Sequence, residues 1–238
     1  MTTRPDVHIL DQRTPEERAR SFLPGMGRTW LLPLYDVFTR AAGVGALHAR
    51  AAELADVRPG QSALDVGCGT GNLALAVLAR QPAARVTGLD PDGDALRRAA
   101  RKARRRGVSL TLDQGYADRL PAEDASLDHV LSSLALHHLD DDGRTDFARE
   151  ALRVLRPGGR ITIVDLGGGS HDHTGGRASG HSGLHGLMSR VVPARAVAHN
   201  HGSAVPELLL GAGFSDAREV AHVDHRFGRV TFVQATRA

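Results

Sequence analysis

The chain holds a single cysteine, Cys68, among its 238 residues. One thiol excludes an internal disulfide, and it excludes any metal site built from several cysteines. Aromatic residues are also scarce, at 4% of the chain, whereas hydrophobic residues reach 41%. This apolar content is sufficient for the core of one α/β domain with additional segments.

Long apolar stretches are absent as well. No uninterrupted run approaches the roughly 18 residues that a membrane-spanning helix requires. The first twenty residues contain no apolar core of the kind found in signal peptides. We therefore expect no membrane span and a cytoplasmic location.

The chain also has little excess charge of either sign, since its formal net charge is only +3. Its isoelectric point is nevertheless near 9.7. The densest run of basic residues is 97–106, RRAARKARRR, which holds seven of the 30 lysines and arginines. On a helix, Leu96, Ala99, Ala100 and Ala103 share one face, and the cations occupy the remainder. The pattern favours a solvated outer helix face, with a phosphate-contacting patch as the alternative, so we expect no nucleic-acid partner.

The most informative stretch that is present is residues 63–72, ALDVGCGTGN. Residues 63–66 are typical of a short buried strand, and residues 72–79 have the composition of a helix. Between them lie Gly67, Gly69 and Gly71, which let a ligand approach the backbone because they carry no side chain. A strand, a glycine turn and a helix begin a βαβ unit in which backbone N–H groups face a ligand. The spacing differs from the G-x-G-x-x-G expected under a dinucleotide pyrophosphate.

A second buried strand is predicted at residues 85–90, RVTGLD, and it ends in the carboxylate of Asp90. An acidic side chain at the tip of this strand can accept hydrogen bonds from both hydroxyls of a ribose. Together, the glycine turn and the acidic tip predict a site for a nucleoside-containing cofactor.

These residues resemble the class I S-adenosylmethionine-dependent methyltransferases. Residues 65–71, DVGCGTG, match the first motif of that family, and residues 88–90, GLD, match the acidic end of its second strand. Residues 155–160, LRPGGR, match the turn before its fifth strand. The resemblance covers the chain from about Tyr35 to the C-terminus, and it implies S-adenosylmethionine as the cofactor.

The resemblance also implies a fold and a division of the chain. It predicts a Rossmann-like α/β fold with a seven-stranded, mostly parallel sheet, helices on both faces and an antiparallel last strand. Residues 1–57 would form an N-terminal helical cap, and residues 58–238 would form the methyltransferase domain. Residues 167–202 are rich in glycine and hold six of the thirteen histidines. We expect them to form a lid, since their histidines lack the spacing of known metal sites, and we expect no bound metal.

The family's motifs assign roles to residues around the glycine turn. Asp65 would order the turn and the amino end of the cofactor, Gly67 and Gly69 would line its methionine portion, and Asp90 would hold the ribose. The remaining cofactor contacts that the resemblance implies here are Cys68, Thr70, Asn72, Pro91, Ser133 and Tyr35.

The loop beside the adenine departs from the family pattern. An Asp usually follows the glycine there and bonds the adenine amino group, whereas this chain has Tyr116 after Gly115. Three adenine contacts therefore remain open. Tyr116 could stack or donate a hydrogen bond, Asp118 could replace the usual Asp, or the backbone of Ala117 could make the contact.

Methyl transfer from a sulfonium requires mainly that nucleophile, methyl carbon and sulfur be held in line and away from water. His137 and His138 follow the fourth predicted strand, where an acceptor would lie beyond the carboxyl ends of the strands. A neutral imidazole there could remove a proton from the acceptor. We favour His138 because it resembles the second His of the family's His-His-Leu stretch. The alternative is that both histidines are structural.

The acceptor is constrained by what the chain lacks. No Asn/Asp-Pro-Pro-aromatic element follows the fourth strand, and the only cysteine lies in the glycine turn. Methylation of nucleobases is therefore disfavoured, and we expect a small organic acceptor methylated on O, N or C. Two alternatives stay open: a non-catalytic cofactor-binding regulator, because Tyr116 breaks a pattern, and a nicotinamide-dependent oxidoreductase, against which the glycine spacing argues.

Overall fold

The computed structural model describes residues 5–20, 43–167, 204–225 and 228–238. The expected contact Tyr35, the expected lid at residues 167–202 (apart from Gly167) and its histidines lie outside these residues. The described part forms one eight-stranded sheet with the strand order β1-β4-β3-β2-β5-β6-β8-β7. No helix of this part is long and apolar enough to cross a membrane.

The central strands are β2 (Ser62–Val66), β3 (Arg85–Asp90), β4 (Leu110–Gln114), β5 (Leu127–Ser133) and β6 (Leu155–Leu166), all parallel. The strand β8 (Gly228–Thr236) runs antiparallel to β6 and to β7 (Ser215–His225), which confirms the expected reversal at the end of the chain. Residues 155–160, expected to form a turn before the fifth strand, are instead part of β6, where Gly158 takes a φ of +78°.

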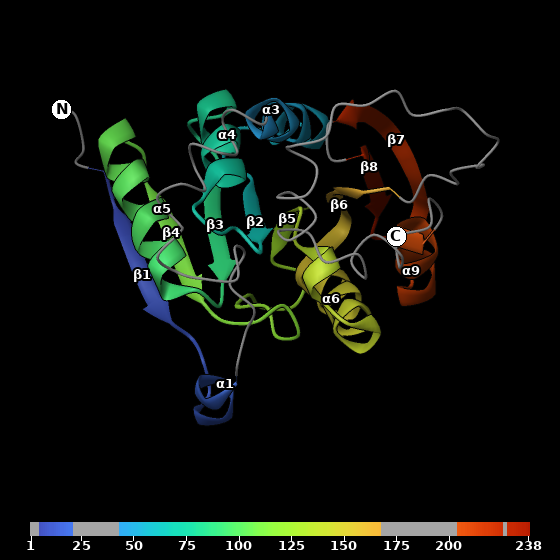
Figure 1. The fold of residues 1–238 in the computed structure, drawn as a ribbon, viewed down its shortest axis with the longest axis horizontal. Helices are drawn as coiled ribbons and strands as arrows, with labels where there is room; N and C mark the ends of the chain where they lie inside the picture. The colour runs from blue at the N-terminus through green and yellow to red at the C-terminus, as the bar shows by residue number, and fades with distance from the viewer. Residues whose placement is uncertain (1–4, 21–42, 168–203, 226–227) are drawn as a thin grey trace, which may run out of the picture.

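The expected strand count of seven is wrong, because an additional strand forms in the N-terminal segment that we had assigned to a helical cap. The strand β1 (Val7–Asp11) pairs in parallel with β4, from Val7 opposite Leu110 to Asp11 opposite Gln114. The helix α1 (Pro15–Ala19) follows, and the capping box of Thr14 and Glu17 fixes its start. Figure 1 shows α1 beyond the carboxyl end of β1, on the side to which the parallel strands point.

Helices cover both faces of the sheet, as expected (Figure 1). One core packs beneath α3 (Val44–Ala55), α4 (Asn72–Arg80) and α5 (Gly93–Arg106). The other packs beneath α6 (Asp141–Val154) and α9 (Ala204–Ala212). The two cores hold the layers together because each helix turns an apolar stripe toward the sheet.

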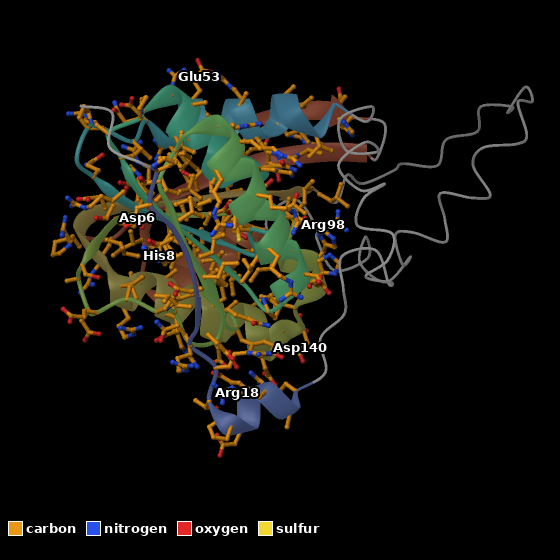
Figure 2. The ribbon with its side chains drawn as sticks, turned by 90° about the vertical axis from the view of Figure 1, so that its left-hand side faces the viewer. Asp6, His8, Arg18, Glu53, Arg98 and Asp140 are labelled. Carbon is orange, nitrogen blue, oxygen red and sulfur yellow. The ribbon has the colours of Figure 1, made fainter. Side chains whose placement is uncertain are left out.

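In the basic helix α5, the capping residues set the two ends of the helix, and the apolar positions decide which face packs on the sheet. Its N-cap Asp92 accepts hydrogen bonds from the backbone N–H groups of Asp94 and Ala95, and Gly107 ends the helix with a φ of +66°. The alanines and Leu96 of the predicted apolar face are buried, whereas most of the arginines are exposed. The solvated outer face is thus observed for five of the six arginines of α5, whereas Arg98, which Figure 2 labels, is half-buried. Lys102 is also half-buried, against the glycine turn.

Candidate functional site

A pocket of about 200 Å³ lies where β2, β3 and β5 end. The chain leaves β2 toward β3 on one side, and β5 lies on the other side of β2, so the sheet order reverses at this point. Ligands of open α/β sheets bind outside the carboxyl ends of the strands at such a reversal. The predicted site residues that line the pocket are Asp65, Gly67, Cys68, Gly69, Thr70, Asn72, Asp90, Pro91, Tyr116, Ala117, Ser133 and His138.

The glycine turn takes backbone conformations that favour glycine. Gly67 and Gly69 have φ angles of +71° and +52°. A Cβ atom at Gly67 would come within 2.5 Å of the Ala135 Cβ, whereas a Cβ at Gly69 would meet nothing within 4 Å. The space at Gly69 is therefore open, and a ligand can approach the backbone there.

Asp65 is buried beneath this turn, with 1% of its surface exposed. Its Oδ2 accepts a hydrogen bond of 3.0 Å from the N–H of Ala74, in the first turn of α4. Burial raises the pKa of this carboxyl from 3.8 to about 7, and the hydrogen bond from Ala74 opposes the shift. Asp65 thus ties the end of β2 to the start of α4 and fixes the turn between them.

Asp90 reaches the pocket from the end of β3. Its Oδ2 accepts a hydrogen bond from the Gly69 N–H at 2.8 Å, and its Oδ1 accepts one from the Asp92 N–H at 2.9 Å. Burial raises its pKa from 3.8 to about 6 against these two hydrogen bonds. Each carboxylate oxygen retains a second lone pair. The carboxylate is therefore held rigidly and can still accept hydrogen bonds from a ligand.

The raised pKa of Asp90 predicts that ligand affinity depends on pH. Ligand hydroxyls donate to the ionised carboxylate, so a ligand that they hold should bind with release of a proton below about pH 6. We expect the affinity for S-adenosylhomocysteine to rise between pH 5 and 7, by up to about tenfold per pH unit at the acid end. Calorimetry in buffers of different ionisation enthalpy measures the proton release. An Asp90→Asn variant should lose the dependence, and an unchanged dependence in that variant would assign it to another group.

The loop after β4 divides the expected adenine contacts. Tyr116 and Ala117 lie in the pocket wall, but Asp118 does not. The carboxylate of Asp118 instead pairs with Arg20, with 2.5 Å between Oδ2 and the guanidinium nitrogen. Of the three possible contacts, the structure thus brings two to the pocket and turns the third toward the N-terminal segment.

An Asp118→Asn substitution tests this division. Because the carboxylate points away from the pocket, we expect the affinity for S-adenosylhomocysteine to change less than about threefold, within the small effects typical of substitutions away from a site. The comparison is calorimetric titration of the variant beside wild type. A loss of more than tenfold with unchanged amide exchange in residues 116–119 would show that Asp118 reaches the adenine when the cofactor binds, whereas faster exchange would show that the pair with Arg20 holds the loop.

The two histidines occupy different surroundings. His138 lies in the pocket wall, whereas His137 lies behind it, with its Nδ1 2.9 Å from Oδ1 of the buried Asp165. The two rings lie 4.2 Å apart between centroids. Loss of hydration lowers the pKa of His138 from 6.5 to about 4. Its side chain is nevertheless exposed, so water moderates this shift, and His138 is neutral at pH 7.

Several wall residues were not predicted from the sequence. His48 comes from α3, Asp92 from the start of α5 and Phe147 from α6. Leu134, just after β5, has a φ of +54°, which is costly for a branched side chain and is often found near functional sites. These residues reach the pocket through tertiary packing, and no local motif marks them.

A single lysine borders the same pocket. Lys102 is the one lysine among the 30 lysines and arginines of the chain. Its Nζ donates to Thr70 Oγ1 at 2.8 Å and to Asn72 Oδ1 at 2.9 Å, and both acceptors are in the pocket wall. Burial, with the charge of Lys102, lowers the pKa of His48 to about 4. A positive charge is thus placed beside the glycine turn and the N-terminus of α4, whose dipole has the same sign.

The pocket fits a nucleoside cofactor on three observations. Asp90 offers hydrogen-bond acceptors, the turn at Gly69 is open to a ligand, and Ser133 Oγ is buried without a partner among the described residues. An unpartnered buried hydroxyl in a pocket wall is satisfied when a ligand supplies a hydrogen bond. Among the described residues, no cluster of three His, Cys, Asp or Glu could hold a metal ion.

Comparison with known proteins identifies the central part of the chain. A family model described as a methyltransferase domain matches residues 63–159. Methyltransferase GfsG of Streptomyces halstedii is 39% identical over 116 residues, which cover 48% of this chain and 41% of that protein. The demethylmenaquinone methyltransferase of Thermus thermophilus is 33% identical over 139 residues, which cover 57% of this chain and 62% of that protein. The chain thus spans about two fifths to three fifths of these relatives.

Solved structures share the fold over a larger part of the chain. The [4+2]-cyclase SpnF superposes with a TM-score of 0.65 and 21% identity over 81% of each chain. An S-adenosylmethionine-dependent methyltransferase from Aquifex aeolicus superposes with a TM-score of 0.57 and 20% identity, over 78% of this chain and 87% of that one. At these identities the likeness concerns the fold alone. Taken with the motifs of the glycine turn and β3, residues 63–159 are a methyltransferase domain, and the fold around it is the one shared by an S-adenosylmethionine-dependent methyltransferase.

Proposed function

We propose that the protein binds S-adenosylmethionine in this pocket and transfers its methyl group in line to a small organic acceptor. The observation that carries the proposal is that one pocket holds the open glycine turn, the carboxylate of Asp90 and the imidazole of His138. When bound, the cofactor supplies an activated methyl group on a sulfonium. Asp90 would hold the ribose hydroxyls, and Tyr116 and Ala117 would border the adenine.

The chain's own contribution is mainly positioning. Asp65 and the positive-φ glycines fix the turn, so the pocket is formed before a ligand enters. Buried apolar residues, among them Leu89, Leu136 and Phe147, form part of the wall and exclude water from the reacting atoms. His138 would accept a proton from a hydroxyl or an ammonium acceptor, because its imidazole lines the pocket and is neutral at pH 7.

Two measurements test the proposal. Calorimetry should show binding of S-adenosylhomocysteine and no binding of NADH, since the glycine spacing does not suit a dinucleotide. Methyl-labelled cofactor is then incubated with phenols, hydroquinones, amines and carboxylic acids, and the label should move to one class. Failure to bind S-adenosylhomocysteine would refute the proposal, and NADH binding would favour an oxidoreductase.

A second candidate is a cofactor-binding protein that does not transfer methyl groups. The neighbour SpnF, whose fold is shared at a TM-score of 0.65, is described as a cyclase. Tyr116 also stands where the family usually has an acidic residue. Tight binding of S-adenosylhomocysteine with no transfer of label to any acceptor would support this candidate.

Lys102 provides a test of how the cofactor is oriented. We expect its positive charge to stabilise the cofactor's carboxylate at the end of the pocket formed by Thr70 and Asn72. A Lys102→Met variant should bind S-adenosylhomocysteine about tenfold more weakly, the typical contribution of a charged hydrogen bond. Its affinity for 5′-methylthioadenosine, which lacks the amino-acid part, should not change. Calorimetry with both ligands makes the comparison.

The matched control is Arg101→Met, because Arg101 precedes Lys102 on the same helix and is exposed. This variant should bind both ligands like wild type. An equal loss for both ligands in Lys102→Met would show instead that the lysine supports the shape of the turn.

A further inference from the structure

We propose that the N-terminal strand–helix unit, residues 7–20, is a clamp that holds the adenine-side wall of the pocket in its binding conformation. The inference rests on the proposed function, since the wall matters through the cofactor that it borders. The unit lies outside residues 63–159, which match the methyltransferase domain. Arg20 and Glu17 of the unit, together with Arg119 of the loop, are its positioning residues.

The clamp begins at the edge of the sheet. Five residues of β1 pair with β4, the strand that leads directly into the loop at residues 115–120. Arg104 of α5 also donates to the carbonyl of Val7 at 3.1 Å. Figure 2 looks onto this edge, with β1 in front of the sheet and α1, marked by Arg18, at its end. The unit is therefore fixed to the body of the domain before it reaches the loop.

The first link between the unit and the loop is an arginine–carboxylate fork. Two guanidinium nitrogens of Arg119 lie 2.9 and 2.7 Å from the two carboxylate oxygens of Glu17. Arg119 also donates to the carbonyl of Gln12 at 2.5 Å. The side chain of Glu17 is 10% exposed and that of Arg119 is 44% exposed, so solvent screens this pair from the arginine side only. The two partners lie 102 residues apart in the sequence.

The second link reaches the pocket wall itself. The guanidinium of Arg20 lies 5.1 Å from the centroid of the Tyr116 ring, and it pairs with Asp118 on the same loop. The hydroxyl of Tyr116 donates to the carbonyl of Arg20 at 3.2 Å. Tyr116 is thus held at its ring and at its hydroxyl while it borders the pocket.

The loop is anchored on its other side by α6. The backbone N–H of Leu120 donates to Glu150, and Arg153 donates to the carbonyl of Leu120. Residues 116–119 are therefore held by contacts with α6 on one side and with the clamp on the other. Without the clamp, the loop would be anchored only at its two ends, by the pairing of β4 with β3 and by α6, and would populate conformations in which Tyr116 leaves the wall. A binding site formed only part of the time has its apparent affinity reduced by that fraction.

Amide hydrogen exchange of the ligand-free protein measures how often the loop at residues 116–119 opens, and it requires no assumption about the cofactor. In an Arg20→Met/Arg119→Met variant, amides of residues 116–119 should exchange about tenfold faster or more, since two charge-assisted links are removed. Amides of the central strands should be unchanged. The matched control is Arg18→Met, because Arg18 lies in α1, two residues before Arg20, and pairs at 3.3 Å with Asp11 inside the unit.

The same variants are then titrated with S-adenosylhomocysteine. If the loop is open in about nine molecules of ten, the affinity should fall about tenfold in the double variant. A cycle of Glu17→Gln, Arg119→Met and their combination should be non-additive in loop exchange, because both changes break one pair. Unchanged loop exchange in the double variant, or additive effects in the cycle, would overturn the clamp. Absence of cofactor binding by wild type would overturn the proposed function and leave the exchange result standing.

Discussion

Replacing Asp90 with Ala is expected to lower the affinity for S-adenosylhomocysteine about a hundredfold, since charge-assisted hydrogen bonds to two hydroxyls are worth about 2–3 kcal/mol together. The fold should survive, because the Asp90 carboxylate lies at the end of β3, where it accepts hydrogen bonds from two backbone N–H groups, and the alanine retains the backbone pairing of the strand. Calorimetric titration measures the affinity, and circular dichroism verifies the fold. Unchanged affinity in a folded variant would remove Asp90 from the site.

Two further variants separate the contribution of Asp90 to ligand binding from its support of the glycine turn. Asp90 accepts from the Gly69 N–H, so an alanine also frees the glycine turn. Asp90→Asn retains one acceptor oxygen and should lose less affinity than Asp90→Ala. Asp94→Ala is the matched control, because Asp94 follows closely in the chain but pairs with Arg97 on the exposed side of α5. It should bind like wild type.

The elements that the sequence predicted are those marked by local backbone chemistry. Gly67 and Gly69 take positive φ angles, and an acidic residue at the end of β3 faces them, so motif and geometry coincide. The burial pattern of α5 likewise follows its helical period. Such features depend on residues close together in the sequence, and a pattern can therefore reveal them.

The strand β1 shows why other elements could not be predicted. Of its five residues only Val7 is buried, while Ile9 and Leu10 are exposed. The alternation of apolar and polar residues covers only Val7, His8 and Ile9, and the pairing with β4 across about a hundred residues decides the conformation of the strand. The positions of Arg20 and His48 beside the pocket depend on the same long-range packing.

Replacing His138 with Gln is expected to slow turnover about a hundredfold if the acceptor must lose a proton, the usual contribution of a general base. Residual activity should remain, because in-line positioning does not depend on the imidazole. The base must be neutral to accept the proton. Since surrounding protein lowers the pKa of His138 from 6.5 toward about 4, wild-type turnover should fall only as the pH drops through this range.

The measurement is kcat against pH at saturating cofactor, so that the titration of Asp90 does not enter through binding. His138→Gln should lose the acid limb, with S-adenosylhomocysteine affinity close to wild type. His137→Gln is the matched variant, because His137 bonds Asp165 outside the pocket wall and should retain the acid limb. If both variants keep the wild-type rate and acid limb, neither histidine is the base, and catalysis depends on positioning by the pocket alone.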